Sequence, residues 1–83
     1  MEKEVKVGNI AKKYENPMME LIHVACCYSS VIKLEKANSC VNAKSIMGII
    51  SFDLSEDDEV NVLIEGDDET EAMAAIEKFL SVV

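Results

Sequence analysis

The chain has 83 residues and a mass of 9.2 kDa, which suits one small domain with a single hydrophobic core. Hydrophobic residues make up 49% and charged residues 29%, a composition typical of globular proteins and not of disordered ones. The net charge of −8 is unevenly spread. Residues 1–52 carry seven Lys and five acidic residues, whereas residues 53–83 carry one Lys and eleven acidic residues. This balance disfavours nucleic-acid binding, because phosphate contacts need a basic face.

Targeting signals and metal motifs are missing from the sequence. No apolar run is long enough to cross a membrane, and the first residues lack the apolar core of a signal peptide. Cys26 and Cys27 are adjacent, a spacing that rarely forms a useful disulfide, and Cys40 is the third and last Cys. His23 is the single His, too few for a zinc site at these spacings, and no Gly-rich phosphate loop is present. We therefore predict a cytoplasmic protein with reduced, mostly packed thiols and no metal or cofactor.

The first half of the chain predicts three strands and one helix. Residues 4–7 alternate polar and apolar, as in a half-buried strand. Asn16-Pro17 is typical of a helix start, and the helix is expected to end at Ser29-Ser30. Its apolar stripe consists of Met18, Leu21, Ile22 and Ala25. A strand over 31–35, a tight turn at residues 37–38 and a short strand over 40–42 complete a predicted hairpin.

The second half predicts a strand followed by a helix. Residues 44–50 are short and apolar, so strand and helix both remain open, although Ser45 as a cap favours a helix. Residues 56–59 form an acidic turn, and residues 60–65 form the clearest strand. Asp68 and Glu71 have the spacing of a capping box, ahead of a final helix. Its buried face is expected to contain Met73, Ile76, Phe79 and Leu80. The mixed order favours an α+β fold, an antiparallel sheet with helices on one face.

One segment carries a family resemblance. The sequence Val-Asn-Ala-Lys-Ser-Ile-Met-Gly-Ile-Ile-Ser, residues 41–51, closely resembles the regulatory-serine segment of HPr, the phosphocarrier of the bacterial sugar phosphotransferase system. The likeness extends without a gap to the last helix and back to Pro17, and it is greatest to the HPr and Crh proteins of Gram-positive bacteria. It implies one domain over residues 1–83 with the HPr-like open-faced β-sandwich (βαββαβα), whose four-stranded antiparallel sheet has helices on one face.

The likeness breaks down where HPr proteins accept a phosphoryl group. The family carries an acceptor His, a supporting Arg and a Pro at the start of its first long helix. In this chain Tyr14 stands at the His position and Asn16 at the Arg position, and Pro17 is kept. A phenol with an ordinary pKa of about 10 replaces imidazole poorly, and Glu15 adds a repelling charge. The resemblance thus implies a degenerate phosphohistidine site without a catalytic residue.

Two other side chains could take part in phosphate chemistry. The resemblance places His23 in the middle of the same helix, without free N–H groups for a phosphate, so we expect a contact role for it. Ser45 matches the Ser that HPr kinase/phosphorylase phosphorylates in the family. A phosphate there would meet the positive end of a helix dipole, and Lys44 can add a counter-charge. A capping role alone is the alternative for Ser45.

Several apolar residues are expected to form a partner-binding surface. Ile46, Met47 and Ile50 correspond to the patch by which HPr-type proteins meet enzyme I, the kinase and the catabolite control repressor. Covering the small core is the equal alternative for this patch. The first long helix would add Met19 and His23 to the surface, with no Arg on that face.

The resemblance also marks two acidic substitutions. Asp53 and Asp57 replace family glycines near the loop before the last strand. Asp tolerates positive φ angles better than most residues, so the turn is expected to survive.

The sequence leaves three functions open. The first is a non-catalytic regulatory protein that acts through Ser45 and the apolar patch in carbon catabolite regulation. The Crh branch of the family, which also lacks the acceptor His, is the precedent. The second is a phosphocarrier that accepts its group from enzyme I at another residue. The third is a plain protein-interaction module. None is an enzyme with turnover, and the oligomeric state is open.

Overall fold

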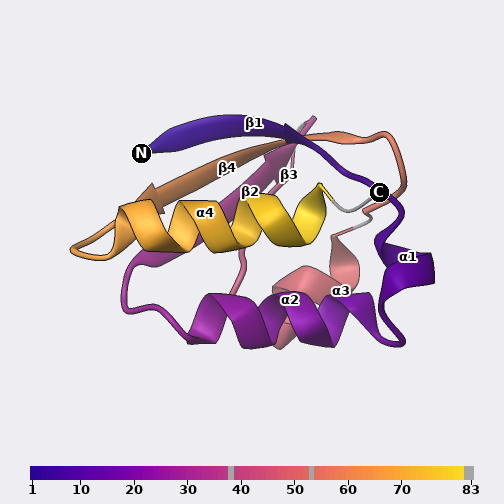
Figure 1. Cartoon of the computed structure of the whole chain (residues 1–83), viewed down its shortest axis with the longest axis horizontal. Helices are drawn as coiled ribbons and strands as arrows, with labels where there is room; N and C mark the ends of the chain where they lie inside the picture. Colours follow the sequence, from indigo (N-terminus) through magenta and orange to yellow (C-terminus); the bar gives the residue numbers. More distant parts are fainter. Residues whose placement is uncertain (38, 53, 82–83) are drawn as a thin grey trace.

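Four antiparallel strands form one sheet in the computed structural model, which describes residues 1–37, 39–52 and 54–81. The strand order is β1-β4-β2-β3. The elements in chain order are β1 (Glu2–Lys6), α1 (Ile10–Lys13), α2 (Pro17–Cys26), β2 (Val31–Lys36), β3 (Ser39–Asn42), α3 (Ile46–Ser51), β4 (Glu59–Glu65) and α4 (Glu69–Leu80). The helices α2, α3 and α4 lie on one side of the sheet (Figure 1). The predicted open-faced α+β architecture, a four-stranded antiparallel sheet with helices on one face (Figure 1), is therefore confirmed.

The strands place apolar side chains on one face of the sheet because successive residues point to opposite sides. Three alternating residues of β4, namely Val60, Val62 and Ile64, are buried, and so are Ile32 and Leu34 of β2. The register sets Val62 opposite Leu34 and Ile64 opposite Ile32, so these side chains share a face. The other face carries charged residues such as Lys33 and Glu35, which are exposed.

The helices bury the predicted apolar stripes against this face. In α2 the buried residues are Leu21, Ile22 and Ala25, with Met18 half-buried beside the core. In α4 all four predicted core residues, Met73, Ile76, Phe79 and Leu80, are buried. The two helices contact each other and run in opposite directions (Figure 1). Burial of complete aliphatic side chains, at about 1.5–3 kcal/mol each, is the main stabilising contribution to this layer.

Several local expectations are corrected by the structure. The helix α1 was not predicted, although Asn9 caps it through a hydrogen bond from the Lys12 N–H to Asn9 Oδ1 (3.1 Å). The first strand covers Glu2–Lys6 instead of residues 4–7, and α2 ends at Cys26, before the expected Ser29-Ser30. The thiols do not pack in the core. Cys26, Cys27 and Cys40 are free and exposed.

Two turns adopt the left-handed backbone conformation. Asp57 has a φ of 74°, so this turn is formed with an Asp in the left-handed conformation, as expected. Ala37 has a φ of 54° in the predicted tight turn of the β2–β3 hairpin. The expectations for Asn38 and Asp53 lie outside the described residues.

Candidate functional site

Tyr14, predicted to stand at the acceptor position, packs against the C-terminal helix. It follows α1 in an extended conformation, and its N–H donates to the Ile10 carbonyl oxygen (2.9 Å). Its ring stacks on Phe79 of α4, with centroids 4.5 Å apart and an angle of 14° between the planes. Phe79 is buried and Tyr14 half-buried, so the tyrosine ring is part of the helix packing.

Asn16 and Pro17, the two other residues of the predicted degenerate site, lie at the start of α2. Pro17 occupies the first helical position, where its missing N–H and fixed φ angle fit a helix start. Asn16 is the N-cap residue, but its side chain makes no capping hydrogen bond. Its carbonyl oxygen accepts from the Glu20 N–H (3.1 Å), which begins the helix. Glu15 and Asn16 are both exposed, so a carboxylate and an amide flank this helix start.

Ser45 is the N-cap of α3, which settles the open choice between strand and helix for residues 44–50. Its side-chain oxygen accepts from the Gly48 N–H (3.2 Å), and its carbonyl oxygen accepts from the Ile49 N–H (2.9 Å). The Ser45 N–H donates to the Asn42 carbonyl oxygen (3.0 Å), which fixes the residue between β3 and α3. The residue is half-buried, so its environment combines a helix start with partial solvent access.

An exposed apolar patch lies beside Ser45. It consists of Ile46, Met47 and Ile50 on α3, whose exposed fractions are 52%, 83% and 68%. These residues do not cover the core, because Ile49 alone is the buried residue of this helix. The adjacent helix α2 contacts α3 and carries the exposed residues Met19 and His23. The structure thus brings the predicted partner-binding residues onto two neighbouring helices.

Lys44, which precedes Ser45, connects the two helices. Its Nζ donates to the Tyr28 carbonyl oxygen just beyond the end of α2 (2.5 Å), and its N–H donates to Asn42 Oδ1 (2.9 Å). A cation beside the last carbonyl groups of a helix is favourable because it opposes the negative end of the dipole. The ammonium group thus lies beside the end of α2, and its role as a counter-charge to a phosphate on Ser45 stays a prediction.

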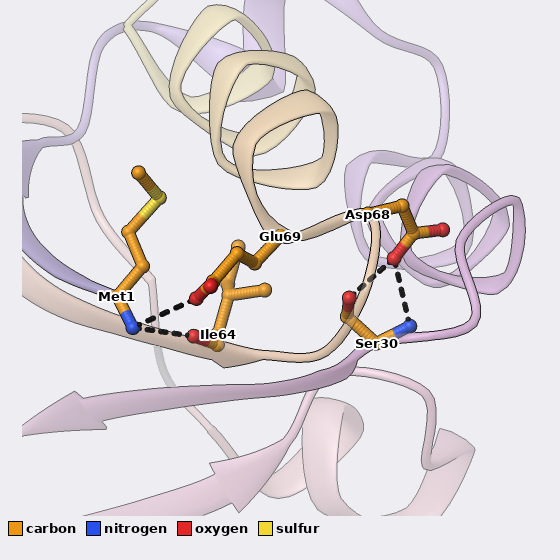
Figure 2. Close-up of polar contacts among 5 residues, drawn as sticks. All are labelled: Met1, Ser30, Ile64, Asp68 and Glu69. Carbon is orange, nitrogen blue, oxygen red and sulfur yellow. Dashed lines mark hydrogen bonds and ion pairs between the residues drawn. The ribbon is translucent and has the colours of Figure 1, made fainter.

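Hydrogen bonds from Ser29 and Ser30 to the Asp68 carboxylate link the start of β2 to the start of α4, and we call these three residues the Asp68 clasp. The carboxylate accepts from the N–H and the hydroxyl of Ser30 (Figure 2). It also accepts from the Ser29 N–H (2.9 Å). Hydrogen bonding from the Ser30 hydroxyl, followed by the Ser29 N–H, lowers the pKa of Asp68. The predicted capping box is wrong, because Asp68 is the N-cap residue of α4 but its side chain makes no capping hydrogen bond. The carboxylate is instead used in contacts across the fold.

A second contact ties β1 to β4 and α4 beside this clasp. The Met1 ammonium group donates to the Ile64 carbonyl oxygen (2.8 Å) and pairs with the Glu69 carboxylate (3.0 Å), as Figure 2 shows. Further along the same strand, Lys3 forms an ion pair with Glu77 of α4. These contacts hold the edge strand against the helical layer, away from the predicted site.

Sequence reasoning missed one feature near the site, a groove between α2 and α4. Tyr14 and Phe79 form part of it, together with residues from the end of α2. The apolar i, i+3 and i+4 spacing of α2 and α4 indicated their buried stripes, but no local pattern marks the line where two helices meet. Among residues 1–37, 39–52 and 54–81, no group of His, Cys, Asp and Glu side chains is arranged to hold a metal. None of the described helices is long and apolar enough to span a bilayer.

Comparison with known proteins agrees with the fold. The family described as "PTS HPr component phosphorylation site" matches residues 1–81. The chain is 35% identical over 80 residues to the HPr-like protein Crh of Halalkalibacterium halodurans, covering 96% of this chain and 95% of that protein.

Solved structures extend this likeness to three dimensions. The crystal structure of HPr-C-His from Thermoanaerobacter tengcongensis has a TM-score of 0.86 and 38% identity, covering 96% of this chain and 90% of that one. The solution structure of Crh from Bacillus subtilis has a TM-score of 0.69 and 31% identity, and all of both chains is covered. The chain belongs to the HPr family of the phosphotransferase system.

Proposed function

We propose that this chain is a cytoplasmic, non-catalytic regulatory member of the HPr family. It acts by binding protein partners through Ser45 and the apolar patch of Ile46, Met47 and Ile50. The observation that carries the proposal is that Ser45 caps α3 directly before this exposed patch. A phosphate on Ser45 would place about two negative charges at the edge of the patch, and so change which surfaces it binds.

The exposed apolar side chains support a binding role over a purely structural one. Met47 is 83% exposed, although Met is among the residues most often buried. Three such residues on one short helix, with a fourth, Met19, on the adjacent helix, form the kind of surface that proteins use for transient partners. HPr kinase/phosphorylase, a catabolite control repressor and enzyme I are the candidate partners, and Ser45 is the proposed regulatory phosphorylation site.

The proposal includes the loss of histidyl phosphocarrier activity. The stacking of Tyr14 on Phe79 and the exposed carboxylate of Glu15 both disfavour phosphoryl transfer at the start of α2. His23 lies within α2, where the backbone N–H groups are used in the helix, so it offers no backbone donors to a phosphate.

Incubation with phosphoenolpyruvate and a Gram-positive enzyme I tests this loss. We expect the chain to gain no phosphate when its intact mass is measured under non-acidic conditions. A known HPr in the same reaction serves as the positive control. Acid-labile phosphate that disappears in His23→Gln would establish the phosphocarrier alternative and overturn the proposal.

A plain interaction module differs from a regulated protein in its response to charge at Ser45. If Ser45 is a regulatory position, Ser45→Asp changes the affinity for a Gram-positive catabolite control repressor, measured by calorimetry. Ser51→Asp, at the far end of α3, is the matched control. Equal affinities for the unmodified chain and Ser45→Asp would favour the unregulated module.

A further inference from the structure

The groove between α2 and α4 is a concave site on the helical layer, and it shares no lining residue with the apolar patch on α3. It has a volume of about 320 Å³, at the lower end of the range of about 300–1,000 Å³ that small-molecule pockets occupy. Its main lining residues are Tyr14, Val24, Cys27, Tyr28, Lys78 and Phe79. They come from both helices and from the segments before and after α2.

The charge of the groove is opposite to that of the whole chain. The chain carries sixteen acidic residues and eight Lys, yet the lining contains one charged residue, Lys78, and no carboxylate. Lys78 is exposed, and within the described residues it makes no ion pair. The neighbouring carboxylate on α4, Glu77, pairs with Lys3 of β1. The groove therefore combines apolar walls with a single cation that an anion could meet.

Aromatic rings supply most of the apolar wall. Tyr14 and Phe79 are stacked, which fixes both rings, and Tyr28 contributes a third ring to the lining. Among the described residues, neither tyrosine hydroxyl makes a hydrogen bond, so both remain available as donors. Rigid aromatic surface with a few polar groups is typical of sites for small organic ligands.

We propose that this groove binds a small organic anion with an aromatic or branched apolar body and one carboxylate. The apolar body packs against the rings of Tyr14, Tyr28 and Phe79, and the carboxylate pairs with Lys78. The proposal is independent of Ser45 and of the apolar patch, since neither contributes to the groove.

Binding is tested with phenylbutyrate as the probe, by titration of the isotopically labelled chain and observation of backbone amide shifts. We expect saturable shifts at millimolar probe concentrations, centred on Tyr14, Val24 and Ala75. Shifts centred instead on Ile46, Met47 and Ile50, or shifts that do not saturate, would overturn the proposal. Either result would mean that the probe adheres to exposed apolar surface and not to the groove.

Filling the groove provides a matched pair of variants. Cys27 lines the groove and Cys26 does not, although both are exposed at the end of α2. Cys27→Trp is expected to weaken probe binding by about tenfold or more, which corresponds to about 1.4 kcal/mol. Cys26→Trp is expected to leave binding unchanged and controls for the effect of a new indole on folding. Equal affinities in the two variants would contradict the proposed location.

The anion preference is tested separately. Phenylbutanol, which has the same ring and chain but no charge, is expected to bind about twofold to fivefold more weakly than phenylbutyrate, as for an exposed ion pair. Lys78→Gln should remove this preference, whereas Lys33→Gln on the open face of the sheet should keep it. An alcohol that binds the unmodified chain as tightly as the acid would overturn the assignment of an anionic ligand.

Discussion

Gly66 and Ser30 approach each other so closely that a side chain at position 66 would force one of them to move. Gly66 has a φ of 153°, and a Cβ atom placed on it would lie 2.4 Å from Ser30 Oγ and 2.7 Å from Ser30 Cα. This contact lets Ser30 reach the Asp68 carboxylate, so the turn after β4 and the clasp form one unit.

Gly66→Ala is therefore expected to lower the free energy of unfolding by about 1–3 kcal/mol, through backbone strain alone or together with displacement of Ser30. Urea denaturation measures the effect. Gly48→Ala in α3 is the matched control, because a Cβ there meets its nearest neighbour at an ordinary 3.4 Å and Ala favours a helix. A loss at position 48 as large as that at position 66 would contradict the special role of Gly66.

The Asp68 clasp predicts a particular response to acid. Because hydrogen bonds from Ser30 and Ser29 lower the pKa of Asp68 in the folded chain, the ionised carboxylate stabilises the fold above its unfolded pKa. That contribution is lost as the pH falls through the lower pKa of the folded state.

Asp68→Asn should accordingly lower Tm at neutral pH, and the difference from the unmodified chain should shrink as the pH falls toward about 2. Thermal unfolding followed by circular dichroism at several pH values gives the curve. Asp67→Asn, one residue away, should show little difference at any pH. A constant Tm difference for Asp68→Asn at all pH values would argue against the clasp as its cause.

At the scale of elements, the helix α3 places one side chain in the core and the next one on the surface. Ile49 is fully buried, whereas Ile50, the next residue, is 68% exposed. Neighbouring residues on a helix point about 100° apart, so one isoleucine anchors the helix and the other lies on the apolar patch.

The two positions therefore predict different effects for the same substitution to Ala. Ile49→Ala is expected to lower the free energy of unfolding by about 2–5 kcal/mol because it leaves a core cavity. Ile50→Ala should change stability by less than about 0.5 kcal/mol while weakening partner binding. Urea denaturation and binding to a catabolite control repressor, measured side by side, separate the two effects. Loss of stability in Ile50→Ala would show that the patch serves the core.

The periodic elements were predictable because their patterns are local. Alternation in β4 and the apolar stripes of α2 and α4 identify their buried faces directly. The helix α1 has four residues, too few to show a period, and was missed. The use of Asp68 was misjudged because its partner Ser30 lies 38 residues away, so local spacing favoured a cap instead. The placement of Ser45 before the patch followed from the family resemblance.

At the scale of the whole molecule, the uneven charge sets the electrostatic behaviour. Eleven acidic residues and one Lys lie in residues 53–83, and the net charge of the chain is −8. The ion pairs described between the two parts, such as Lys3 with Glu77 and Lys36 with Asp58, are at the surface or partly exposed. Self-repulsion among the remaining carboxylates therefore opposes folding at low ionic strength.

Salt should consequently stabilise the protein. We expect Tm to rise with added NaCl as the Debye length falls from about 30 Å at 0.01 M toward about 10 Å at 0.1 M. Glu56→Gln, which removes one exposed charge from the acidic turn before β4, should raise Tm at low salt and reduce the response. A Tm that falls as NaCl is added would show that attractive ion pairs outweigh the repulsion.

The measurement that tests the central claim most directly is intact mass after incubation with ATP and a Gram-positive HPr kinase/phosphorylase. The unmodified chain and Ser51→Ala should each gain one phosphate, while Ser45→Ala should gain none. This result would establish Ser45 at the start of α3 as the regulatory position. A chain that gains no phosphate, or gains it equally in Ser45→Ala, would contradict the account.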